Sequence, residues 1–192
     1  MMRRCVWLVS AAVFILFAFV SVTVAADLTA DTVTKAGKRT TPGKIAVKGD
    51  KFRLEPAYTP IFNIGRGDKG VLWEINGAEK TYGEAKLTPA LKPRIDEKLP
   101  GEISRKQVGQ ETIDGHPAKK FEVSVKEGNK TETYYQWWAT DVSFPVKLAN
   151  ANGSWSVEYK NIKKGAADNL FELPPDTNKD RSYIPDALTG GH

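Results

Sequence analysis

The stretch GKIAVKGDKFRLE, residues 43–55, carries the pattern from which we infer the architecture of the protein. Its apolar side chains occupy alternate positions from Ile45 to Leu54, on both sides of the dipeptide Gly49-Asp50. Neighbouring side chains in a strand point to opposite faces of a sheet, so an apolar period of two predicts strands. The stretch therefore predicts two antiparallel strands joined by a tight turn at residues 49–50.

The same alternation recurs along the chain. It is present at residues 71–75, which lead into the turn dipeptide Asn76-Gly77, and again at residues 121–125 and 155–159. Antiparallel sheets with one covered face alternate in this way, whereas parallel strands buried on both sides contain continuous apolar runs. We therefore predict a mainly β protein of eight to eleven antiparallel strands, with one apolar face and one solvated face.

Residues 87–101 interrupt the alternation. Apolar residues recur there at intervals of four from Leu87 to Leu99, and Thr88-Pro89 could begin a helix. Pro93 lies inside the segment, and proline removes a helical hydrogen bond. The expected structure is a broken or 3₁₀-like helical stretch.

The amino terminus has the pattern of a secretory signal peptide. Two arginines precede an apolar run over residues 5–26, and Val24-Ala25-Ala26 provides small side chains before Asp27. We predict a signal peptide over residues 1–26 and export to the periplasm. The alternative is an inner-membrane anchor formed by residues 5–26, because about 20 apolar residues span a bilayer core.

Charge and composition describe the remaining chain. The full chain has 28 Lys and Arg residues, of which Arg3 and Arg4 belong to the leader. Residues 27–192 therefore have 26 Lys and Arg residues against 23 Asp and Glu residues. This nearly neutral, evenly mixed charge does not favour a nucleic-acid partner. The single cysteine, Cys5, also lies in the leader, which excludes thiol catalysis, disulfides and Cys-ligated metal from the mature chain.

The sequence contains no recognisable catalytic or metal-binding motif. His116 lies in a predicted turn, His192 is the last residue, and no serine has the Gly-x-Ser-x-Gly context of a hydrolase. The calcium-like start at residues 176–180 lacks the required glycine and the closing carboxylate. We therefore expect no catalytic residues, no metal and no cofactor, and a protein that is not an enzyme.

Aromatic residues are concentrated in the sequence YYQWW, residues 134–138. In a strand, Tyr134 and Trp138 would share one face and Tyr135 and Trp137 the other. Either both faces are covered locally, or one pair contacts a ligand, a membrane surface or a partner. Tyr135 and Trp137 are accordingly candidate ligand-binding residues.

Several short motifs, in this order, resemble the outer-membrane lipoprotein-sorting (LolA/LolB-like) superfamily and its periplasmic relatives. They are residues 43–55, Val71-Leu72-Trp73, Tyr82, residues 108–116, Lys120-Phe121-Glu122-Val123, residues 138–141, Phe144-Pro145-Val146-Lys147 and Leu170-Phe171-Glu172-Leu173-Pro174. The resemblance covers most of residues 30–175, so we expect one domain over residues 27–175 and a loosely ordered C-terminal tail over residues 176–192.

This resemblance implies an antiparallel, unclosed half-barrel whose concave apolar face is covered by short helical lid segments and can accept acyl chains. The alternation then suggests which residues line that concavity. They are Ile45, Val47, Phe52, Leu54, Trp73 and Ile75, with Leu87, Leu91 and Ile95 as the lid.

Two departures from the family pattern leave the ligand open. Few residues separate Ala26 from the first strand, where the family's carrier has an amphipathic helix, and Gly49 replaces the carrier's basic lid-locking residue. Three hypotheses therefore remain: a lipoprotein carrier, a relative that binds another lipid, and a relative that shares only the fold.

The sequence thus predicts a non-enzymatic domain of the bacterial envelope that binds a lipid, an acyl chain or a lipoprotein. The alternative is an envelope sensor or interaction module of the same fold, with an envelope protein as partner. Membrane contact is expected only through an uncleaved leader or transiently.

Overall fold

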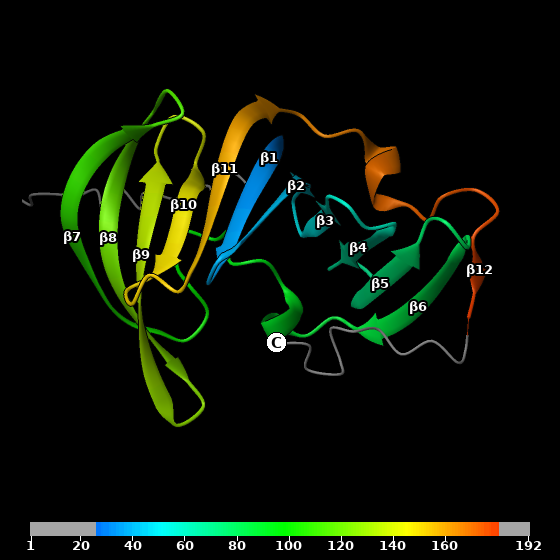
Figure 1. The fold of residues 1–192 in the computed structure, drawn as a ribbon, viewed down its shortest axis with the longest axis horizontal. Coiled ribbons are helices and arrows are strands. Elements are labelled where there is room, and N and C mark those ends of the chain that lie inside the picture. The colour runs from blue at the N-terminus through cyan, green and yellow to red at the C-terminus, as the bar shows by residue number, and fades with distance from the viewer. Residues whose placement is uncertain (1–25, 181–192) are drawn as a thin grey trace, which may run out of the picture.

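The computed structural model describes residues 26–180, which form a single curved sheet with two short 3₁₀ helices (Figure 1). The elements in chain order are β1 (Asp27–Ala36), β2 (Arg39–Lys48), β3 (Lys51–Pro56), β4 (Ile61–Arg66), β5 (Val71–Asn76), β6 (Thr81–Lys86), η1 (Pro89–Leu91), β7 (Glu102–Ile113), β8 (His116–Glu127), β9 (Lys130–Ala139), β10 (Phe144–Asn150), β11 (Trp155–Lys164), η2 (Asp168–Phe171) and β12 (Asn178–Lys179).

The strands lie in the order β12-β6-β5-β4-β3-β2-β1-β11-β10-β9-β8-β7. Hairpin connections build the two halves of the sheet, and the antiparallel pairing of β1 with β11 joins them. The order ends at β12 and β7, so the sheet is not closed. The predicted antiparallel, unclosed half-barrel is confirmed.

The number of strands was underestimated, since the described residues form twelve rather than eight to eleven. β1, where a first strand was expected, contains three threonines and one lysine and has little apolar alternation. β12 has only two residues, and it pairs in parallel with Thr81 and Tyr82 of β6. Strands of these kinds depend on their neighbours for stability and leave a weak sequence signal.

The hairpin from which the fold was inferred forms as predicted. Ile45 pairs with Leu54 and Val47 with Phe52, and Gly49 in the connecting turn has a φ of +63°. A positive φ is inexpensive for glycine and costly for residues with a Cβ. The turn therefore fixes the register that puts these four side chains on one face.

The sheet has apolar clusters on both faces, contrary to the expectation of one apolar and one solvated face. We define the inner face by the largest buried cluster, which extends from Leu28 on β1 to Val123 on β8. On the outer face, one cluster gathers around Trp73 and Phe171 and another around Trp137 and Val146. The outer face is apolar where another part of the chain covers it or where long side chains lie across it.

Two connections cover opposite sides of the sheet (Figure 1). Residues 87–101, which we call the strap, connect β6 to β7 across the inner face and include η1. Residues 166–173, which we call the outer cover, contain η2 and pack against the outer face of β2–β6. The predicted broken helix at 87–101 is confirmed, because only Pro89–Leu91 are helical.

Two predictions concern the ends of the chain. The leader, as signal peptide or anchor, lies outside the described residues apart from Ala26, and within 26–180 no helix is long and apolar enough to cross a bilayer. Of the predicted tail over residues 176–192, Asn178 and Lys179 form β12, and residues 181–192 lie outside the described part. The domain boundaries and the leader stay predictions.

Candidate functional site

The inner face contains a groove of about 780 Å³ that is open to solvent on one side. Its walls come from β1, β2 and β3, from β9, β10 and β11, and from the strap. In a flat sheet, β3 and β9 would be about 24 Å apart, since five strand spacings separate them. They line one groove because the sheet curves around the inner face.

The groove has an apolar floor and more polar walls. Leu148, Val157 and Tyr159 are buried at its base, and Leu54 and Trp155 are half-buried beside them. Burial raises the pKa of the Tyr159 hydroxyl, which keeps this ring uncharged at the base of the groove. The polar groups of the walls are the hydroxyls of three threonines and four charged side chains, namely Thr32, Thr34, Thr41, Lys44, Glu55, Lys92 and Arg94.

Arg94 of the strap closes one side of the groove. Its guanidinium lies 4.7 Å from the centre of the Tyr134 ring and donates a 2.6 Å hydrogen bond to Glu127. The Tyr134 hydroxyl donates to the same carboxylate at 2.8 Å. Burial disfavours the charged form, but the hydrogen bonds from Tyr134 and Arg94 hold the pKa of Glu127 below its usual value. The three side chains tie the strap to β8 and β9.

A second polar contact holds the strap beside Gln136, which is fully buried on the inner face. Its amide donates to the Asp96 carbonyl at 2.9 Å, and its oxygen accepts from Arg105 at 2.9 Å. Arg105 also donates to the Glu97 carbonyl and to Glu102. A buried amide with both ends satisfied fixes the chain that it contacts. This residue was missed in the sequence, although a lone amide among four aromatics was a usable signal.

Seven of the predicted site residues share the inner face as expected, but most of them pack in the core and do not line the groove. Ile45, Val47 and Phe52 are 2%, 2% and 4% exposed, so they belong to the core below the strap. Leu87, Leu91 and Ile95 of the strap are half-buried against the inner-face clusters. Among the predicted residues, Leu54 lines the groove.

The sequence predicted that Trp73 and Ile75 line the concave inner face, but both lie on the outer face. The register pairs Phe52 with Gly65 and Gly65 with Leu72, so Leu72 shares the inner face with Phe52. Trp73, the next residue, points outward and packs with Phe171. A shift of one residue reverses the face, and the β3–β4 turn that sets this register has no strong sequence signature.

Tyr135 and Trp137 also lie on the outer face, away from the groove. Trp137 is 7% exposed because Lys120 and Lys147 lie 4.7 and 5.1 Å from its ring, and its indole nitrogen donates to Glu111. The predicted alternation within residues 134–138 is confirmed, but Tyr134, not Tyr135, contributes to the groove. Any binding role for Tyr135 and Trp137 stays a prediction.

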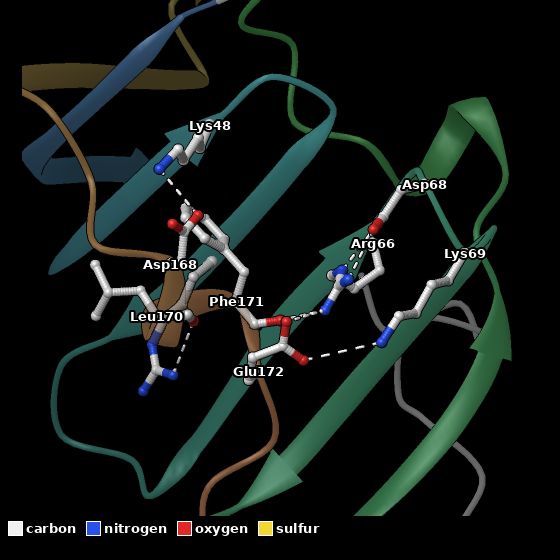
Figure 2. Close-up of polar contacts among 9 residues, drawn as sticks. Lys48, Arg66, Asp68, Lys69, Asp168, Leu170, Phe171 and Glu172 are labelled. Carbon is white, nitrogen blue, oxygen red and sulfur yellow. Dashed lines mark hydrogen bonds and ion pairs between the residues drawn. The ribbon is translucent and has the colours of Figure 1, made fainter.

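The outer cover is joined to the sheet by the contacts in Figure 2. Arg66, 5% exposed, donates to the Phe171 carbonyl at 3.1 Å and to Glu172 at 2.7 Å, and it forms a bidentate pair with Asp68. Hydrogen bonds from Arg66 lower the pKa of Asp68 to about 2. Phe171 is fully buried beneath this network. These contacts seal the outer face at the cover.

The titratable side chains of residues 26–180 form ion pairs and no cluster that could hold a metal ion. Groups of three or more potential metal ligands are absent from this part of the chain. His116 and Asp141 form a 2.7 Å pair at the start of β8, and the hydrogen bond from His116 lowers the pKa of Asp141. The inner-face groove is the candidate functional site of the described residues.

Comparisons with known proteins show similarity in fold. No family model and no curated protein matches the chain. A chain of the Pseudomonas aeruginosa MucA/MucB complex is 15% identical with a TM-score of 0.52, over 78% of this chain and 56% of that one. This chain therefore spans just over half the length of that protein. MucB shares the LolA-like fold.

Two further solved structures are less similar. The Mycobacterium tuberculosis lipoprotein LppX is 12% identical with a TM-score of 0.44, over 73% of this chain and 89% of that one. A putative outer-membrane lipoprotein-sorting protein domain from Vibrio parahaemolyticus is 11% identical with a TM-score of 0.36, over 77% and 89%. At identities of 11–15%, the similarity to these solved structures concerns the fold alone.

Proposed function

We propose that this protein is a non-enzymatic binding protein that holds the acyl chain of a lipid or lipoprotein in the inner-face groove. The observation that carries the proposal is the groove of about 780 Å³ with an apolar floor, between the strap and the curved sheet. Pockets that bind small molecules commonly have volumes of about 300–1,000 Å³ and apolar linings with a few polar groups. The signal peptide predicted over residues 1–26 supports a periplasmic location for this proposed activity.

The base of the groove favours an apolar chain over a polar substrate. Leu148 and Val157 offer no hydrogen bond at the base, and burial keeps the Tyr159 hydroxyl uncharged. The Arg94–Glu127–Tyr134 contacts satisfy one another at the side. A polar substrate would lose hydrogen bonds to water in such a place, whereas an acyl chain would not.

The direct test uses residues 27–192 purified without detergent, with a fluorescent fatty acid as probe and mass spectrometry of an organic extract as a second readout. Thr34→Trp would fill the groove, because Thr34 is a half-buried wall residue. We expect at least a tenfold loss of probe affinity. Ser104→Trp is the matched control, since Ser104 is exposed on β7 outside the groove. Absence of probe binding by the unmodified protein, together with a lipid-free extract, would refute the proposal.

A protein-binding role is the second candidate, and one observation favours it. Ile103 and Val108 are 60% and 43% exposed on β7, whose outer edge no described strand covers. A free strand edge can pair with an extended segment of a partner. The similar chain of known structure comes from a complex of two proteins.

Site-specific photo-crosslinking in cells tests this second role. A photoreactive residue at position 103 should give discrete crosslinked products, and the same residue at exposed Lys163 should not. Equal products at both positions would count against β7 as a binding edge. The fatty-acid assay is independent of this result, because Ile103 does not line the groove.

A further inference from the structure

The groove opens at one end of the sheet, where three turns and the strap meet. The β1–β2, β3–β4 and β10–β11 turns lie at this end, since Ala36 pairs with both Arg39 and Trp155 and Gly43 pairs with Pro56. Pro56 and Trp155 line the groove here. We call this end the mouth, and it consists of residues 35–42, 56–60, 88–93 and 150–155.

The charged side chains of the mouth are all positive. These segments contain four cations and no Asp or Glu. The cations are Lys35, Lys38, Arg39 and Lys92, all of them exposed. Lys38, Arg39 and Lys92 form no ion pair with any of residues 26–180.

This charge is local and not a property of the whole surface. Residues 27–192 have only three more Lys and Arg than Asp and Glu, from 26 against 23. The four mouth cations exceed that difference, so charges elsewhere on the domain nearly cancel. A localised positive surface attracts anionic surfaces over about a Debye length.

Tyr58 is the most exposed large hydrophobic side chain of the described residues. It is 92% exposed in the β3–β4 turn and has a φ of +69°. A positive φ is unusual for an aromatic residue, so the turn holds an apolar ring outward at a backbone cost. Tyrosine is enriched where membranes meet water, because its ring is apolar and its hydroxyl remains solvated.

We propose that the mouth docks on the surface of an anionic lipid bilayer. Lys38, Arg39 and Lys92 contact the headgroups, and the Tyr58 ring lies at headgroup depth. The groove then opens toward the bilayer, so an acyl chain passes between the two without crossing open water. The route for the chain rests on the proposed function, whereas the docking does not.

Vesicle sedimentation tests the docking, with vesicles of phosphatidylcholine alone or mixed with phosphatidylglycerol. We expect binding to the anionic vesicles that is largely lost in about 1 M salt, where charges are screened within about 3 Å. The variant Lys38→Glu/Arg39→Glu/Lys92→Glu should bind at least tenfold more weakly, because each basic residue near an anionic surface contributes about fivefold.

A matched control separates position from net charge. Lys119→Glu/Lys163→Glu/Lys164→Glu makes the same charge change at exposed lysines that also lack ion pairs within residues 26–180. It should bind clearly better than the mouth variant. Tyr58→Asn removes the ring and tolerates a positive φ, and it should weaken vesicle binding severalfold with unchanged circular dichroism.

Three results would overturn the docking: no binding to anionic vesicles, equal binding to neutral ones, or equal binding by the two triple variants. The fatty-acid assay in solution is the separate readout for the groove. Lys38→Glu/Arg39→Glu, which changes two mouth residues outside the groove lining, should bind the probe as the unmodified protein does. Mouth-dependent vesicle binding, found together with no probe binding and a lipid-free extract, would support the docking and refute the proposed acyl-chain site.

Discussion

The strap and the outer cover are both short connections with one turn of 3₁₀ helix, yet they cover the sheet differently. The outer cover places fully buried Phe171 on the sheet and satisfies a buried arginine, Arg66. The strap is held at its second half by Gln136 and by the buried side chain of Leu99, while Leu87 and Leu91 in its first half are only half-buried. The half of the strap that lacks a buried anchor leaves room beside it for a groove.

The largest expected effect comes from Phe171→Ala in the outer cover. Truncating a fully buried phenylalanine costs about 3–5 kcal/mol through lost burial and the remaining cavity. The corresponding strap variant, Leu91→Ala, should cost only about 1 kcal/mol because its side chain is half-buried. Urea unfolding of both variants measures the difference. Similar losses of unfolding free energy in the two variants would show that the strap and the outer cover contribute equally to stability.

An intermediate effect is expected from Gln136→Ala, which removes the buried amide below the strap. The Asp96 carbonyl and Arg105 each lose a partner, at a cost of about 1–3 kcal/mol. Amide hydrogen exchange in residues 95–99 should become faster, while residues 166–173 should be unaffected. The control is Gln107→Ala. Because Gln107 is exposed, this substitution should change the free energy of unfolding by no more than about 0.5 kcal/mol. Unchanged exchange in the strap would contradict the assigned anchor.

The smallest expected effect is the pH dependence of the outer cover. The pKa of Asp68 is about 2 in the folded protein, below its value of about 3.9 in unfolded chains. Its contribution is therefore complete above the unfolded pKa and is lost as the pH falls toward 2. Asp68→Asn should lower the urea midpoint at pH 7 and leave it unchanged near pH 2. A difference that persists at low pH would mean that the Arg66–Asp68 charge pair is not its cause.

The sequence located the inner-face core better than it located the groove. Ile45, Val47, Phe52 and Leu54 share a face, as their alternation predicted, because a short turn fixes their register. The wall of the groove consists instead of threonines, of the charged residues Lys44, Glu55, Lys92 and Arg94, and of Tyr134 and Trp155. A solvent-accessible groove wall need not be strongly apolar. Apolar alternation therefore identified the side chains packed in the core and not those that line the groove.

Alternation, glycine turns and the prolines at 93 and 100 were enough to predict an antiparallel sheet interrupted by a broken helix, because these signals act between near neighbours. The unclosed half-barrel was implied by the resemblance to the lipoprotein-sorting superfamily. The tertiary structure decided which face of each strand is concave. That choice depends on register carried through successive strands, and it reversed Trp73. It also depends on the pairing of β1 with β11, more than a hundred residues apart, which curves the sheet around the groove.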